Sequence, residues 1–219
     1  MSIQMEQAMN RLRRDVLSLS ASTIQRTYDA IESLLTMDAE AARRIRDTDV
    51  EIDAMEVDVE NQCIEILARM APFAADLRYV LAAMRINSDL ERIGDLAKTI
   101  AKRVIDLADR PAIAFPAQLE EMASAATAML RNAERALAGK DESLARQVRR
   151  SDDFVDERYK SLVLWSIEQL EKGIADPQGI IDLISITRSI ERIADHATNI
   201  AEDVIFFVNG KVVRHEPIK

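Results

Sequence analysis

The feature that most limits how this chain can fold is an internal repeat at a spacing of 100 residues. Residues 88–105 read SDLERIGDLAKTIAKRVI and residues 188–205 read RSIERIADHATNIAEDVI, with nine identities in 18 positions. Average amino-acid usage would give about one identity over such a stretch. We therefore expect the two halves of the chain to fold in the same way.

Composition and spacing both indicate that the repeated unit is helical. The 219 residues include 5 Gly and 5 Pro, and only 4% are aromatic, which is typical of long helices and not of sheets. Apolar residues recur at intervals of three and four, so they share one helix face and predict the seam of a bundle. In the first copy they are Ile86, Leu90, Ile93, Ala97, Ile100, Val104 and Leu107. In the second they are Ile186, Ile190, Ile193, Ala197, Ile200, Val204 and Phe207.

Helix-breaking residues divide the chain into six stretches. Breaks are expected at Pro72, Asp109 to Pro116, Gly139, Gly173 to Gly179, and Gly210. The predicted helices span residues 3–36, 39–71, 75–108, 117–138, 141–172 and 178–208. Three helices fall in each half. We therefore predict an all-α fold of two tandem three-helix bundles, residues 1–110 and 111–219, packed side by side or end to end.

Net charge and cysteine content limit the cellular compartment and the classes of partner that we expect for this chain. A net charge of -9 and a pI near 4.9 disfavour a nucleic-acid partner, which needs a basic surface. Cys63 is the only cysteine and cannot form an internal disulfide. No stretch has the length and apolarity of a membrane span or a signal sequence. We expect a cytoplasmic protein without membrane insertion.

Pairs of carboxylates four residues apart occupy equivalent places in the two halves. They are Glu91 with Asp95, Asp49 with Asp53, Glu191 with Asp195, and Asp152 with Asp156. Residues at this spacing share one face of a helix, and these faces point away from the predicted core. The pairs are therefore candidates for a shared function on the outside of each bundle.

These pairs have two interpretations: they are ordinary carboxylates on a bundle surface, or they are ligands of a metal ion. Acidic residues are common on bundle surfaces, and Arg92 and Arg192 stand three residues before an aspartate with which each could pair. However, like charges four residues apart cost about 0.2–0.5 kcal/mol per pair. Their recurrence in both halves indicates that something compensates the charge, either these arginines or a hard cation held between neighbouring helices. Thr99 and Asn199 continue the same faces and could support such a site.

The ligands available for a cation are oxygen atoms. His196 and His215 are the only histidines, and neither follows a Glu at the spacing that di-iron bundles use. Zinc sites of the Cys/His type are excluded too, which leaves magnesium, manganese, calcium or oxidised iron. We interpret His196 as a histidine at the rim of the seam. No phosphate-binding loop, dinucleotide motif or nucleophile elbow predicts catalysis.

Several motifs resemble the PhoU family. LERIGD at 90–95 and IERIADHATNIAE at 190–202 are similar to its paired signature. The pattern Pro-x-Ala-x-Asp-Leu-Arg at 72–78 resembles the start of the family's third helix, and residues 210–215 resemble its C-terminal end. The likeness covers essentially the whole chain.

The resemblance implies a function and partners. PhoU proteins are cytoplasmic, commonly dimeric negative regulators of phosphate uptake and of the phosphate-starvation response. Their partners are a phosphate ABC transporter and a phosphate-sensing histidine kinase, so the resemblance implies an adaptor that is not an enzyme. The alternatives are a metal-dependent phosphohydrolase and a metal-free structural adaptor.

The resemblance also bears on the carboxylate pairs. Some PhoU proteins bind multinuclear iron or other metal through E(D)-x-x-x-D motifs, and all four pairs fit this motif. Iron, manganese or magnesium is the implied cofactor, with no organic one. Leu96 and Thr99 replace the usual His and Asn in the first copy. We therefore expect the two sites to differ.

Overall fold

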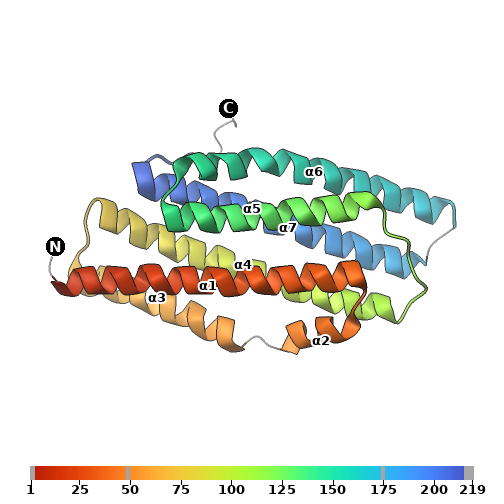
Figure 1. Ribbon diagram of the computed structural model, residues 1–219, viewed down its shortest axis with the longest axis horizontal. Helices are drawn as coiled ribbons and strands as arrows, with labels where there is room; N and C mark the ends of the chain where they lie inside the picture. Colours follow the sequence, from red (N-terminus) through yellow and green to blue (C-terminus); the bar gives the residue numbers. More distant parts are fainter. Residues whose placement is uncertain (1–2, 48–49, 174–175, 215–219) are drawn as a thin grey trace.

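The computed structural model describes residues 3–47, 50–173 and 176–214 (Figure 1). Seven α-helices make up nearly all of this part of the chain, and no strand occurs in it. They are α1 (Ile3–Thr36), α2 (Ala39–Asp47), α3 (Val50–Met70), α4 (Ala75–Ala108), α5 (Ala117–Gly139), α6 (Glu142–Glu171) and α7 (Pro177–Asn209). The predicted all-α class is confirmed, and five of the six predicted helices match within one residue at each end.

The predicted second helix, residues 39–71, is present as two helices. α2 and α3 lie on either side of residues 48 and 49, which are outside the described residues. The buried Arg26 of α1 donates a hydrogen bond to the carbonyl oxygen of Ile45 at 3.1 Å. Carbonyl groups in the last turn of a helix have no partner within it, so this contact satisfies the end of α2. In the second half the corresponding stretch is the single helix α6.

Capping residues account for several of the other helix ends. The side chain of Asp141 accepts from the Leu144 amide before α6, and that of Asp176 accepts from the Gly179 amide before α7. Gly210 ends α7 with φ +79, a conformation that glycine adopts without strain. The break predicted at Gly139 lies one residue later, because Gly139 is the last residue of α5 and Lys140 adopts the left-handed conformation.

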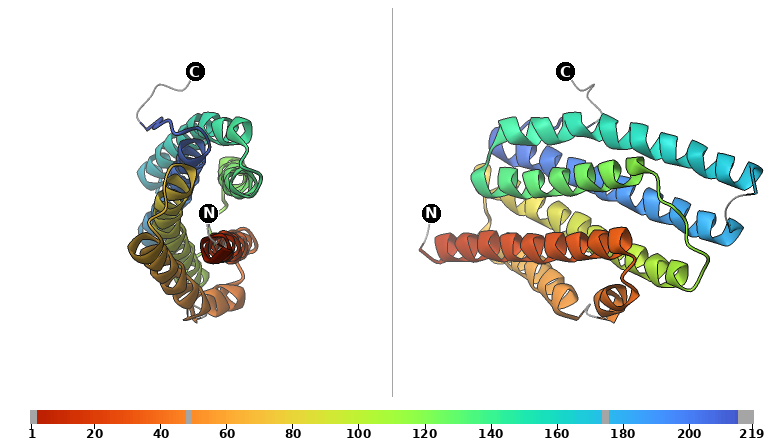
Figure 2. Two further views of the ribbon diagram at one scale, coloured as in Figure 1. Left: turned by 90° about the vertical axis from the view of Figure 1, so that its left-hand side faces the viewer. Right: turned by 45° about the vertical axis from the view of Figure 1, so that its right-hand side comes forward.

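The two halves lie side by side, with α4 and α7 in the middle of the molecule (Figure 1). These helices are antiparallel, because Arg85 near the start of α4 contacts Asp203 near the end of α7, and Arg103 contacts Asp182. Viewed along the long axis, α3, α4, α7 and α6 form a curved layer, and α1 and α5 lie together on one side of it (Figure 2).

A single apolar core runs through both halves. The seam residues Leu90 and Ile93 of α4 and Ile190 and Ile193 of α7 are all fully buried and belong to this core. Cys63 is buried in it as well, and burial raises the pKa of its thiol to about 12. No helix in the described part of the chain has the length and apolar character required to cross a membrane.

Candidate functional site

The structure brings the four predicted carboxylates of the second half together between α6 and α7. Burial, followed by the charges of Asp195 and Asp156, raises the pKa of Asp152 to about 6. The same causes, in the same order, raise the pKa of Glu191. Burial and then the charge of Asp156 raise the pKa of Asp195. The two pairs therefore form one acidic cluster that spans two helices.

The first half has a related cluster between α3 and α4. Burial raises the pKa of Glu56, and the charges of Glu91, Glu60, Asp53 and Asp95 add to the effect in that order. The predicted residues Asp53, Glu91 and Asp95 therefore all lie near Glu56. Asp49, the fourth predicted residue, lies outside the described residues.

Sequence reasoning missed Glu56 of this first cluster. The residue equivalent to Glu56 in the second half is Tyr159, so a comparison of the two copies did not reveal it. Its spacing of three residues from Asp53 was a usable signal, since residues three apart also share a helix face.

Neither cluster is neutralised by the arginines considered as partners. Within the described residues, Arg92 forms no ion pair with Asp95 and Arg192 forms none with Asp195, and both arginines are exposed to solvent. The charge of Arg192 does lower the pKa of Asp195, but by less than burial and Asp156 raise it. Burial and the neighbouring carboxylates therefore determine the direction of the pKa shifts in the second cluster.

The chemistry of these clusters fits a hard cation, although their side chains do not form a closed coordination shell. In the described part of the chain, no three His, Cys, Asp or Glu side chains converge closely enough to hold a metal ion. Oxygen ligands on neighbouring helices suit magnesium, manganese or oxidised iron. Rotation of the partly exposed carboxylates about their side-chain bonds would be required to bring them onto one ion.

His196 and Asn199 face the other half of the molecule and not the acidic cluster. The Nδ1 atom of His196 lies 2.8 Å from the Oδ1 atom of Asp89 on α4, and the amide of Asn199 donates to the same oxygen at 3.3 Å. In the first copy, the Thr99 hydroxyl donates to the backbone carbonyl of Asp95 at 3.0 Å. The interpretation of His196 as a rim histidine agrees with its position.

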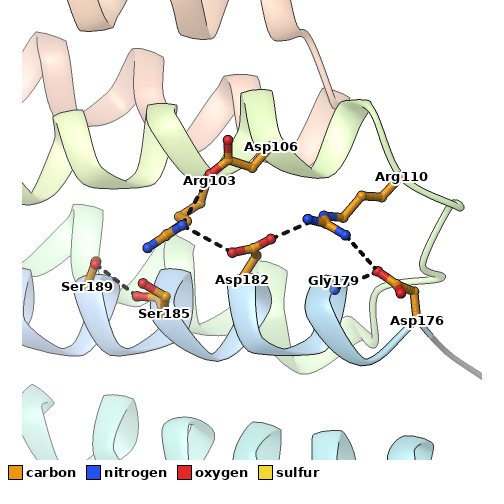
Figure 3. Close-up of polar contacts among 8 residues, drawn as sticks. All are labelled: Arg103, Asp106, Arg110, Asp176, Gly179, Asp182, Ser185 and Ser189. Carbon is orange, nitrogen blue, oxygen red and sulfur yellow. Dashed lines mark hydrogen bonds and ion pairs between the residues drawn. The ribbon is translucent and has the colours of Figure 1, made fainter.

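Two buried aspartates of α7 are bound by arginines of α4, of the segment after α4 and of the segment after α7. Asp182 is 1% exposed and lies 3.2 Å from Arg103 and 3.5 Å from Arg110 (Figure 3). Asp203, also 1% exposed, lies 3.1 Å from both Arg85 and Arg214. The ion pairs made by Arg85, Arg103 and Arg110 connect the two halves at the two ends of the central helix pair, whereas Arg214 belongs to the same half as Asp203.

Sequence reasoning missed both aspartates because they are not repeated. The position equivalent to Asp182 is Ala82, and the position equivalent to Asp203 is Arg103. Since contacts between two copies of a unit join non-equivalent positions, the differences between the copies were the available signal. Different residues therefore hold α4 and α7 together at the two ends of this helix pair.

The chain is similar to proteins of known family. The sequence model of the PhoU domain matches residues 16–104 and 119–204. A phosphate-specific transport system accessory protein PhoU homolog of Xylella fastidiosa is 34% identical over 203 residues, which cover 93% of this chain and 84% of that protein.

Solved structures agree with the fold. The crystal structure of PhoU from Pseudomonas aeruginosa has a TM-score of 0.89 at 31% identity and covers 94% of this chain and 99% of that one. The crystal structure of the phosphate transport system regulatory protein PhoU from Streptococcus pneumoniae has a TM-score of 0.88 at 27% identity, covering 95% and 99%.

Proposed function

This chain belongs to the PhoU domain family, and we propose that it regulates phosphate transport as an accessory protein of the transport system. The observation that carries this proposal is that the family model matches both copies of the repeat, at 16–104 and 119–204. Relatives named as phosphate transport accessory proteins align over 93% of the chain. The similarity therefore concerns the whole fold and not one motif.

The regulation we propose is negative and acts through protein contacts. The protein reduces phosphate uptake and represses the phosphate-starvation response from the cytoplasm, linking a phosphate ABC transporter to a phosphate-sensing histidine kinase. Two copies associate, and no reaction is catalysed. The acidic faces and the net charge of -9 support contacts with cationic partner surfaces, because complementary charge accelerates and orients association.

Deletion of the gene tests this function directly. In rich phosphate, a null strain is expected to express phosphate-starvation genes that the parent strain represses, and a plasmid copy is expected to restore repression. Reporter activity from a phosphate-starvation promoter measures both. A null strain that represses these genes as the parent does would disprove the proposed regulation.

The acidic clusters are proposed to bind metal ions. In the second half Asp152, Asp156, Glu191 and Asp195 would hold the ion, and in the first half Asp53, Glu91 and Asp95 would do so together with Asp49. The raised pKa values in the second cluster support this proposal: burial raises them first and the neighbouring carboxylates add to it, and a bound cation would stabilise the charged forms against both effects. An ion bound there would also link α6 to α7.

Metal affinity at the second cluster is expected to depend on pH. A protonated carboxyl is not a metal ligand, and the pKa of Asp152 is about 6. Binding of Mn²⁺ to the full chain should therefore weaken by about tenfold per pH unit below pH 6 and level off above it. Asp152→Asn is expected to lower the affinity and to reduce this pH dependence, leaving the contribution of Glu191 and Asp195. Isothermal titration calorimetry at pH 5, 6 and 7 measures both effects.

Asp153→Asn is the matched control, because Asp153 is the exposed neighbour on the same helix and is not a proposed ligand. It should bind Mn²⁺ as the wild-type chain does. Equal binding, or none, by the wild type and by the double variant Glu191→Ala/Asp195→Ala would exclude a metal site in this cluster. A metal-free adaptor would then remain.

A further inference from the structure

One exposed stripe of α6 has apolar residues at its centre and opposite charges at its ends. Its residues are Lys160, Leu164, Ile167 and Glu171, all exposed. They are spaced by four, three and four positions and so share one helix face. Leu164 is 63% exposed and Ile167 is 45% exposed. The solvent-facing side of a surface helix is normally polar, so exposed apolar residues at the centre of this face are unusual.

The fold of the single chain does not use this face. α6 packs against α5 and α7 through residues such as Val155, Leu162 and Ser166, which are buried. Nearby, Glu168 and Lys172 form an ion pair at 3.1 Å. In contrast, neither Lys160 nor Glu171 has an ion-pair partner among the described residues. The two charges at the ends of the stripe are therefore available to a partner.

We propose that this stripe is the contact surface between two copies of the chain. α6 would pack antiparallel against α6 of the second copy, with a twofold axis between Leu164 and Ile167. Residues at equal distances from that axis meet, so Leu164 faces Ile167 of the second copy and Lys160 faces Glu171 of the second copy. Symmetry repeats both contacts, as a C2 interface requires.

Charge explains why the partner is a second copy in this orientation. A stripe that reads Lys, Leu, Ile, Glu is complementary to itself only when the two helices run in opposite directions. A parallel pairing would place Lys160 against Lys160 of the second copy and is disfavoured by repulsion. Any other partner would have to carry the same pattern in the same register.

The first half offers an internal comparison. The equivalent positions of α3 are Val57, Asn61, Ile64 and Ala68. Ile64 is 50% exposed, so apolar exposure is similar, but this stripe carries no charge at either end. Self-complementarity is thus found on α6 and not on the equivalent face of α3.

The proposed contact is small. Stable interfaces bury about 1,200–2,000 Å² in total, and a contact made mainly by one pair of helices lies at or below the lower end of that range. We therefore expect a reversible dimer whose dissociation constant is in the micromolar range. This inference deepens the self-association proposed above, and its test is independent of the null strain.

Sedimentation velocity of the full chain over a range of concentrations tests the proposal. Leu164→Glu is expected to weaken dimerisation at least a hundredfold, because it places two carboxylates at the centre of the contact. Lys160→Glu and Glu171→Lys should each weaken it roughly tenfold, since each creates two like-charge contacts. The double variant Lys160→Glu/Glu171→Lys should dimerise as the wild type does, because the exchanged charges are again complementary.

Ile64→Glu serves as the control, since it places a carboxylate on the exposed face of α3, at the position equivalent to Ile167, and should leave dimerisation unchanged. Circular dichroism of each variant verifies that it is folded. A wild-type chain that stays monomeric at about 100 μM, well above the expected constant, would overturn the proposal. A dimer that Leu164→Glu does not weaken would overturn it as well and would show that the copies meet elsewhere. Failure of the double variant to regain dimerisation would overturn the antiparallel pairing.

Discussion

Replacement of Asp182 with alanine is expected to lower the free energy of unfolding by about 2–3 kcal/mol. Asp182 is 1% exposed, and its carboxylate compensates the charges of Arg103 and Arg110 across the interface between the repeats (Figure 3). Loss of one member of a fully buried ion pair costs about 3–5 kcal/mol. Both arginines here keep contact with solvent and with a second carboxylate, Asp106 or Asp176, which reduces the expected loss.

Urea denaturation followed by circular dichroism measures this loss. Asp106→Ala is the matched control, because Asp106 also lies 3.1 Å from Arg103 but is on the surface. Surface ion pairs contribute about 0–1 kcal/mol, so this variant should lose much less stability. If Asp182→Ala and the wild type unfolded at the same urea concentration, the ion pairs would not stabilise the contact between the repeats.

Replacement of Ile93 with alanine is expected to cost about 2–5 kcal/mol and to destabilise both halves together. Ile93 is fully buried on α4, in a core that continues through α7 to α6. Trp165, the only tryptophan, lies on α6 in the other half of the chain. Its fluorescence transition should therefore move to lower denaturant by the same amount as the helical signal measured by circular dichroism.

Ile64→Ala is a suitable control, because Ile64 is half exposed and its truncation should change stability by less than about 0.5 kcal/mol. A different result would be informative about domain structure. If Ile93→Ala shifted part of the helical signal and left the Trp165 transition in place, the halves would unfold separately. The predicted division into residues 1–110 and 111–219 would then describe two independent folding units.

Local signals were sufficient to predict most helices but not the division of the second one. The limits of α1 and α4 were predicted to the residue, because a proline, a turn sequence or a change in apolar spacing marks each end. The separation of α2 from α3 has no such mark. It coincides with a contact from Arg26, which is distant in sequence from Ile45, and spacing within a segment carries no information about such a contact.

Prediction of the acidic clusters from sequence had the same limit, because spacing relates only residues of one helix. Repetition identified Glu191 and Asp195 as a pair, and the structure places them beside Asp152 and Asp156. Glu56 was missed because only the first copy carries it. Two residues on one helix can be related by spacing, but residues on neighbouring helices depend on how those helices are rotated and shifted.

The internal repeat by itself determined the all-α class and the existence of two equivalent units that each carry acidic pairs, because helical periodicity relates residues only a few positions apart. The tertiary structure decided that α4 and α7 are antiparallel and that one core joins the halves. It also decided that Asp182 and Asp203 are neutralised by arginines of other segments. These arrangements join residues about 80 to 120 positions apart, and their energies arise only when both helices are in place.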